Sequence, residues 1–196
     1  CQAINVEPDF IPALQDWIDP DTEVRDNGAE DESYTLLDPP YRTANRVLAD
    51  TSELLLVKGV SVQDYNILTF YVSALPENSY INVNTASTLL LQSLTYDVNP
   101  PDVGRIIALR SDKPYQDIDF FVEDEVFAGK EISADHLTVS SQYFLLTANV
   151  MLGDVPLTLQ SVLYRTTTGT ITVVQRRFGP TREGLLTQTD NTGYQN

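Results

Sequence analysis

The spacing of apolar residues changes close to Thr138, and this change constrains the fold more than any other feature of the chain. Up to residue 136 apolar positions recur at helical spacing and are interrupted by proline and capping residues, which predicts helices joined by capped loops. From residue 137 to 180 three β-rich runs are separated by Gly153-Asp154 and Thr168-Gly169, which predicts a three-stranded antiparallel meander. The fold class is therefore α+β, with a polar tail over 181–196.

The expected elements follow from caps, prolines and periodicity. The stretch 19–40 is too polar and too rich in proline for regular structure, and so long a loop inside a compact domain needs a functional reason. Helices are predicted at 10–18, from Asp50 or Ser52 to Gly59, and at 61–72, 88–94, 101–110 and 118–122, and strands at 143–152, 157–165 and 171–177.

Charge is distributed unevenly along the chain. The net charge of the 196 residues is -16. Residues 1–136 hold 25 acidic and 8 basic side chains, a net charge of -17, whereas residues 137–196 hold 3 acidic and 4 basic ones, a net charge of +1. Such a division suggests two parts with different roles. A negative field of this size repels phosphate backbones and anionic lipids and attracts cations, so nucleic acid is a poor partner.

The loop 16–38 contains nine carboxylates, opposed only by Arg25. Carboxylates this close together repel one another and raise one another's pKa, and a hard divalent cation relieves the repulsion. Asp19-x-Asp21 places two carboxylates on the same side of an extended segment, and Asn27-Gly28 allows a tight turn that brings Glu30 and Asp31 back toward them. The spacing is not that of an EF-hand, and no nearby His or Cys favours zinc or copper. A solvated acidic loop without an ion is the alternative.

Residues about 81–122 are similar to a helix-hairpin-helix or SAM-like unit, and residues about 50–75 resemble a weaker copy. The turn Asp97–Asp102 contains two prolines, which lack N–H donors, and two aspartates, which repel phosphate, so the similarity does not extend to DNA binding.

The sequence carries little that points to catalysis. His136 is the single histidine, and no nucleophile-elbow, zinc-protease or Walker motif is present, so the chain is not expected to be an enzyme and no catalytic residue is assigned. A helix-hairpin-helix nucleic-acid-binding protein and a secreted hydrolase that uses carboxylates are kept as alternative functions. No run of eighteen apolar residues is present, so no membrane span is expected within the chain.

Several segments in one order resemble the K-type minor pseudopilin of the type II secretion system, the general secretion protein K family. The resemblance covers most of the chain and rests on the combination of segments rather than on one motif. The segments are 16–21, 27–31 with Tyr34, 40–46, 52–59, 81–87, 143–146 and 176–179.

The resemblance implies a fold, a site and an assembly. It implies a mostly helical domain (1–136) inserted in a pilin-like α/β domain, of which 137–180 would be the antiparallel strands. It implies calcium in the acidic loop, held by Asp19, Asp21, Glu30 and Asp31, with Asp26 as a further ligand. It also implies a pseudopilus tip subunit bound to I-type and J-type minor pseudopilins, lying in the periplasm.

In this family an apolar N-terminal helix anchors the subunit in the inner membrane. This helix and the first strands of the pilin-like domain are not found in the 196 residues, so the sequence is expected to be part of a longer protein.

Overall fold

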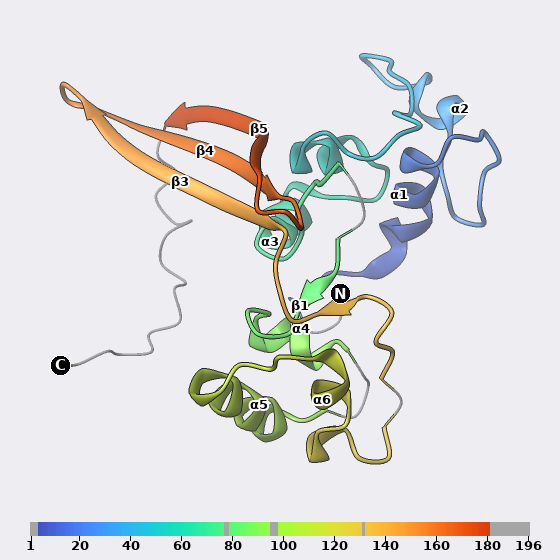
Figure 1. The fold of residues 1–196 in the computed structure, drawn as a ribbon. Helices are drawn as coiled ribbons and strands as arrows, with labels where there is room; N and C mark the ends of the chain where they lie inside the picture. The colour runs from blue at the N-terminus through green and yellow to red at the C-terminus, as the bar shows by residue number, and fades with distance from the viewer. Residues whose placement is uncertain (1–3, 77–78, 95–97, 131, 181–196) are drawn as a thin grey trace. The chain divides into compact units, whose positions relative to one another are not determined.

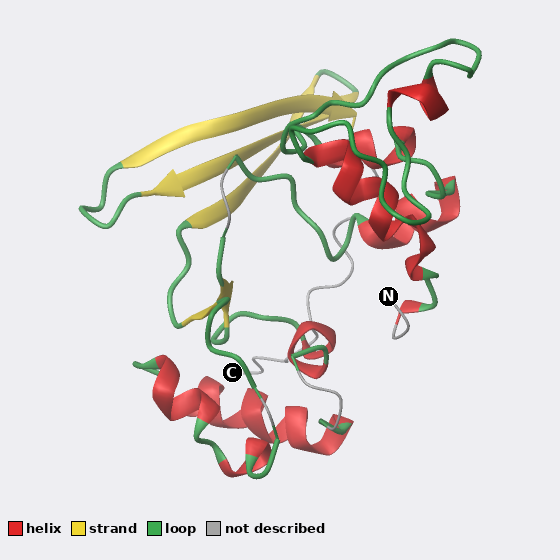
Figure 2. Cartoon of the chain, turned by 90° about the vertical axis from the view of Figure 1, so that its right-hand side faces the viewer, coloured by secondary structure: helices red, strands yellow, loops and turns green. Residues whose placement is uncertain are grey.

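A computed structural model describes residues 4–76, 79–94, 98–130 and 132–180 (Figure 1). The chain forms two compact units, Cys1–Ser140 and Ser141–Asn196. Figure 2 shows helices confined to the first unit and the long strands confined to the second. This is the mixed helix-and-strand fold that the sequence predicts.

The first unit opens with a short 3-10 helix, η2 (Pro8–Phe10), followed by α1 (Ile11–Ile18). Two expectations need correction in the segment that follows. The stretch predicted to lack regular structure contains a one-turn helix, α2 (Asp31–Tyr34), and the helix predicted to end at Gly59 is a 3-10 helix, η3 (Thr51–Leu56). In α3 (Val62–Leu68), Ser61 and Asp64 form a capping box, which explains where this helix begins.

Aromatic packing joins α1 to the loop that follows it. The Trp17 ring meets the Tyr34 ring edge-on at 5.2 Å, and Tyr34 stacks on Tyr41 with ring centres 5.3 Å apart. Trp17 and Tyr34 are buried together with Ala29. Aromatic pairs of this kind stabilise a fold by more than the burial of their surface area alone would give. The start and end of the acidic loop are therefore fixed on one small core.

Residues 81–140 pack around a core of their own, centred on Phe121, Val103 and Ile106. Asn84 ties this part together, because its side chain accepts a hydrogen bond from Tyr115 N and donates to Tyr115 O and Val139 O. The elements are β1 (Ile81–Asn82), α4 (Thr88–Gln92), α5 (Pro100–Asp112), α6 (Ile118–Val122), η4 (Glu125–Phe127) and β2 (Leu137–Thr138).

The parallel pair β1–β2 belongs to the first unit, which ends at Ser140 rather than at the predicted residue 136. Strands of two residues are too short to leave a period in the sequence, so their pairing could not be predicted. In the described residues, no helix is both long and apolar enough to span a bilayer.

The second unit is the predicted meander, formed by β3 (Tyr143–Leu152), β4 (Val155–Arg165) and β5 (Ile171–Pro180) in the order β3-β4-β5. Both pairs are antiparallel, with an irregularity between Val162 and Leu163. The strand β5 runs on to Pro180, beyond the predicted end at Arg177, because a proline at the end of an edge strand costs no ladder hydrogen bond inside the sheet.

The register places most large apolar side chains of the sheet on one face. Residues paired across an antiparallel sheet share a face, so the row Leu146, Ser161 and Arg176 fixes which side each strand presents. Several apolar members of this face are exposed, among them Phe144, Leu146, Val150, Leu152, Val155, Ile171, Val173 and Phe178. Within the described residues this apolar face is thus exposed, whereas a sheet of three strands needs its apolar face covered to be stable.

Candidate metal centre

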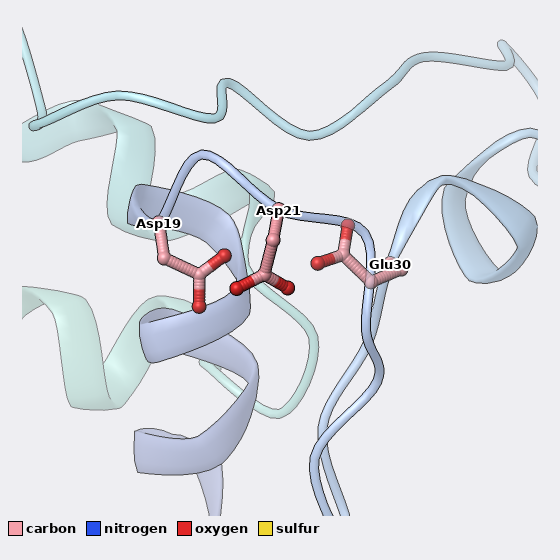
Figure 3. A group of neighbouring side chains, drawn as sticks. All are labelled: Asp19, Asp21 and Glu30. Atoms are coloured by element: carbon pink, nitrogen blue, oxygen red, sulfur yellow. The ribbon is translucent and has the colours of Figure 1, made fainter.

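Three carboxylates converge where α1 ends and α2 begins (Figure 3). Asp19, Asp21 and Glu30 each offer an oxygen, and these oxygens all lie within 4.8 Å of one another. Asp19 is the C-cap of α1, Asp21 follows two residues later, and Glu30 is the N-cap of α2. The loop between them returns to its starting point, so residues eleven positions apart in sequence face one another.

Asp16 organises this return, although it is not one of the three converging residues. Its side chain is completely buried, and Oδ2 accepts hydrogen bonds from Ala29 N at 2.8 Å and from Arg25 N at 3.3 Å. A Cβ at Gly28 would lie 2.0 Å from the same oxygen, so only glycine fits there. Asn27 takes a positive φ of 63°, which forms the predicted turn.

Arg25 supplies positive charge inside the loop. Its Nη1 donates to Asp16 Oδ1 at 2.7 Å and also contacts Asp19 Oδ2. The hydrogen bonds to Asp16 and then to Asp19 raise the pKa of this guanidinium above its usual value. The basic side chain that the sequence shows among nine carboxylates is therefore paired with two of them.

Two oxygens of the cluster have no hydrogen-bond partner among the described residues. These are Asp19 Oδ1 and Glu30 Oε1, and both atoms are buried. Glu30 as a whole is only 3% exposed. Burial, followed by the charges of Asp16 and Asp19, raises the pKa of Glu30 above its usual value. Buried carboxylate oxygens without a donor are costly, and a cation bound between the three residues would satisfy them. The donor set consists of oxygen atoms alone, which suits calcium.

The other two predicted ligands lie outside this group. Asp31 accepts hydrogen bonds from Thr43 Oγ1 at 2.8 Å and Thr43 N at 3.0 Å, and it pairs with Arg42 at 2.8 Å. The hydrogen bond from the Thr43 hydroxyl, helped by the other two contacts, lowers the pKa of Asp31. Asp26 is exposed and is not one of the three residues that converge.

Two residues that shape the site were not identified from the sequence. Asp16 precedes Asp19 by three positions, so both project from one side of the end of α1, and this spacing could have indicated a shared partner. Thr43 Oγ1 lies 3.3 Å from Glu30 Oε2 as well as contacting Asp31. Its distance in sequence gives no signal, because only the folded chain brings residue 43 to residues 30 and 31.

Comparison with known proteins gives the family. Models of the type II secretion system (T2SS), protein K, match residues 1–77 and 81–140. The chain belongs to the type II secretion system protein K family. It is 38% identical over 167 residues to protein K of Pseudomonas aeruginosa, and this match covers 85% of the chain and 50% of the relative. It is 32% identical over 174 residues to protein K of Klebsiella pneumoniae, covering 85% of this chain and 53% of the relative.

A solved structure gives the same relationship at the level of fold. The chain superposes with a TM-score of 0.74 and 27% identity on a chain of the GspK-GspI-GspJ complex from enterotoxigenic Escherichia coli. The match covers 88% of this chain and 63% of that chain. The chain spans about half the length of the curated relatives that it matches.

Proposed function

We propose that this chain is the periplasmic part of a minor pseudopilin that caps the tip of a type II secretion pseudopilus. It would act by assembly with I-type and J-type minor pseudopilins, in support of export across the outer membrane, and not by catalysis. The observation that carries the proposal is the match of 88% of the chain to a solved chain from a GspK-GspI-GspJ complex. An inner-membrane anchor would lie in the further length that its relatives possess.

The finer division of the fold is part of the same proposal. Residues 141–180 would be the strands of a pilin-like domain, and the helical units at about 50–75 and 81–122 would be SAM-like elements of a domain inserted in it. The apolar face of the sheet supports this assignment, because a three-stranded meander with one open apolar face is an incomplete layer.

Assembly is tested by mixing the full-length protein, solubilised in detergent, with the I-type and J-type pseudopilins of the same bacterium. We expect a hetero-complex that elutes as one species in size-exclusion chromatography with light scattering. An unrelated periplasmic protein of similar charge serves as the control. Separate elution of all three proteins under conditions where each is folded would contradict the proposed role.

We further propose that Asp19, Asp21 and Glu30 hold a calcium ion. The ion would offset the repulsion between the carboxylates and tie the end of α1 to the start of α2. Support comes from the convergence of their oxygens and from the buried oxygens of Asp19 and Glu30 that have no partner in the described residues. Asp31 would support the calcium site from outside the group by accepting a hydrogen bond from Thr43. Asp26 is exposed and is given no role in holding the ion.

Calcium binding is tested by thermal melts in EDTA, in calcium and in magnesium. Calcium at 100 times its dissociation constant adds about 2.7 kcal/mol to the free energy of unfolding. For a chain of this size this corresponds to roughly 5–11 °C in Tm. The gain should vanish in Asp19→Ala and Glu30→Ala and persist in Asp26→Ala. Equal melting temperatures in EDTA and calcium would leave the loop a solvated acidic surface.

A further inference from the structure

Arg25 is attached to the acidic loop through both its backbone and its side chain. Its backbone N donates to Asp16 Oδ2 at 3.3 Å, and its backbone O accepts from Gly28 N at 2.8 Å. One side-chain nitrogen, Nη1, donates to Asp16 Oδ1 at 2.7 Å and contacts Asp19 Oδ2. A single nitrogen of this residue therefore links two carboxylates that lie three positions apart at the end of α1.

This contact determines which oxygen Asp19 can offer to a cation. With Oδ2 held by the guanidinium, Oδ1 remains, and it is buried without a hydrogen-bond partner in the described residues. Because a carboxylate is planar, fixing one oxygen limits where the other can lie. Glu30 Oε1 gives an independent indication of a cation, since it too is buried and unpartnered, on a residue that is 3% exposed.

We propose that Arg25 is a positioning residue for the cation site. It holds Asp19 in the orientation of a ligand before the cation binds, and it neutralises Asp16 so that the cation needs to serve only Asp19, Asp21 and Glu30. The inference rests on the calcium site of the proposed function and adds to it the device that preassembles the site. Residues that orient metal ligands from outside the coordination shell commonly change metal affinity by about 10–100-fold.

The sign of the effect separates positioning from simple charge. A guanidinium beside a divalent cation repels it, so removal of the positive charge alone would tighten calcium binding. Loss of the contact to Asp19 acts in the opposite direction, because the freed carboxylate must be ordered again when the cation binds. Weaker binding after removal of Arg25 therefore reports positioning.

The test is calorimetric titration of the whole chain with calcium chloride after removal of metal by EDTA. We expect Arg25→Gln to bind calcium at least about tenfold more weakly than wild type. Arg25→Lys should recover part of the affinity, because one nitrogen makes both contacts in the wild type. Arg42→Gln is the matched control, since it removes the same charge from Asp31, outside the converging group, and should bind at least as tightly as wild type.

A second variant covers the case in which Arg25→Gln fails to fold because the buried Asp16 carboxylate has lost the guanidinium that pairs with it. The double variant Asp16→Asn with Arg25→Gln removes that buried charge, and we expect it to fold and still to bind calcium weakly. Wild-type affinity in either glutamine variant, or no recovery in Arg25→Lys, would overturn the role of Arg25. Absence of calcium binding by the wild-type chain would instead remove the calcium site itself.

Discussion

At the scale of single residues, the acidic loop is shaped by contacts made to Asp16. This buried carboxylate accepts hydrogen bonds from the backbone of Ala29 and from both the backbone and side chain of Arg25. Gly28 lies against the same side chain, at a distance that excludes a Cβ. The return of the loop toward α1 therefore depends on small groups and exact donors, and a substitution here should alter both stability and the cation site.

Gly28→Ala is expected to destabilise the protein by about 1–3 kcal/mol, because the new methyl group displaces Asp16 from its buried hydrogen bonds. Calcium affinity should fall with it. Gly104→Ala is the control, since a Cβ there meets nothing within 4 Å, and alanine in the interior of α5 should stabilise by about 0.5–1 kcal/mol. Urea unfolding of both variants measures the difference. A Gly28→Ala variant as stable as the wild-type protein would show that Asp16 does not hold the loop.

The pKa of Glu30 gives a pH dependence with a definite sign. Burial raises this pKa above its ordinary value of 4.5, so between 4.5 and the raised value the folded state holds a proton that the unfolded state has released. Without metal, the contribution of Glu30 to stability therefore declines as pH rises through this window. Calcium requires the ionised form, so the rise in Tm on adding calcium should increase over the same window.

Thermal melts in EDTA and in calcium, taken across that window, measure this dependence, with Glu30→Gln as the variant that should abolish it. Asp31 acts in a different range, because its pKa is lowered from 3.8 and its contribution is lost only as pH falls below that value. A calcium-dependent gain that stays constant across the window in wild type would contradict the assignment of Glu30 as a ligand.

At the scale of secondary-structure elements, the β-sheet has two unlike faces. One face is built mainly from Leu, Val, Ile and Phe, and the other presents side chains such as Asn149, Thr158 and Gln160. Asn149 Oδ1 accepts a hydrogen bond from Thr158 Oγ1 at 2.8 Å, as expected of a face in water. The apolar face is thus the side of the sheet that needs a covering element.

Val150→Asp, on the apolar face, should reduce the stability of the full-length protein and its recovery with I-type and J-type pseudopilins, because it places a charge under the covering element. Val150 is 56% exposed here, so the 196-residue chain alone should lose little stability. Asn149→Asp, one residue away on the opposite face, is the matched control and should behave as wild type. Co-purification and melting of both variants decide the matter, and loss of complex in both would argue against the assignment of faces.

At the scale of the whole molecule, the two units differ in charge and in core. The buried apolar residues of the described chain all lie between Val6 and Leu137, within the first unit, whereas Ser161 is the buried residue of the second. The acidic residues are concentrated in the same first unit. We therefore expect the first unit to fold alone and the sheet to need contacts beyond its own strands.

A chain that ends at Ser140 should retain a cooperative thermal transition and the rise in Tm with calcium, because the three apolar clusters and the acidic loop are intact. Residues 141–196 alone should show no cooperative transition, since a three-stranded sheet with an open apolar face is marginal in water. Circular dichroism melts of the two pieces test this. A cooperative transition in the sheet alone would show that its strands need no cover.

The sequence by itself determined the larger elements. Helical spacing and caps located α1, α3 and α5, and alternation with glycine turns located the meander, because both signals arise from neighbours in the chain. The ordered segments also indicated the family, to which comparison shows the chain belongs. The density of carboxylates in 16–38 indicated that a cation would relieve their repulsion, and this stays a prediction.

The sequence predicted that a turn at Asn27-Gly28 brings Glu30 and Asp31 back toward Asp19 and Asp21, but only the tertiary structure decided that Asp31 does not join the group. Asp19, Asp21 and Glu30 converge because Asp16 accepts hydrogen bonds from the backbone of residues 25 and 29, whereas Asp31 turns to Thr43 and Arg42. The pairing of β1 with β2 likewise joins residues more than fifty positions apart. Contacts between such distant segments depend on how the whole chain packs, and spacing along the sequence carries no record of them.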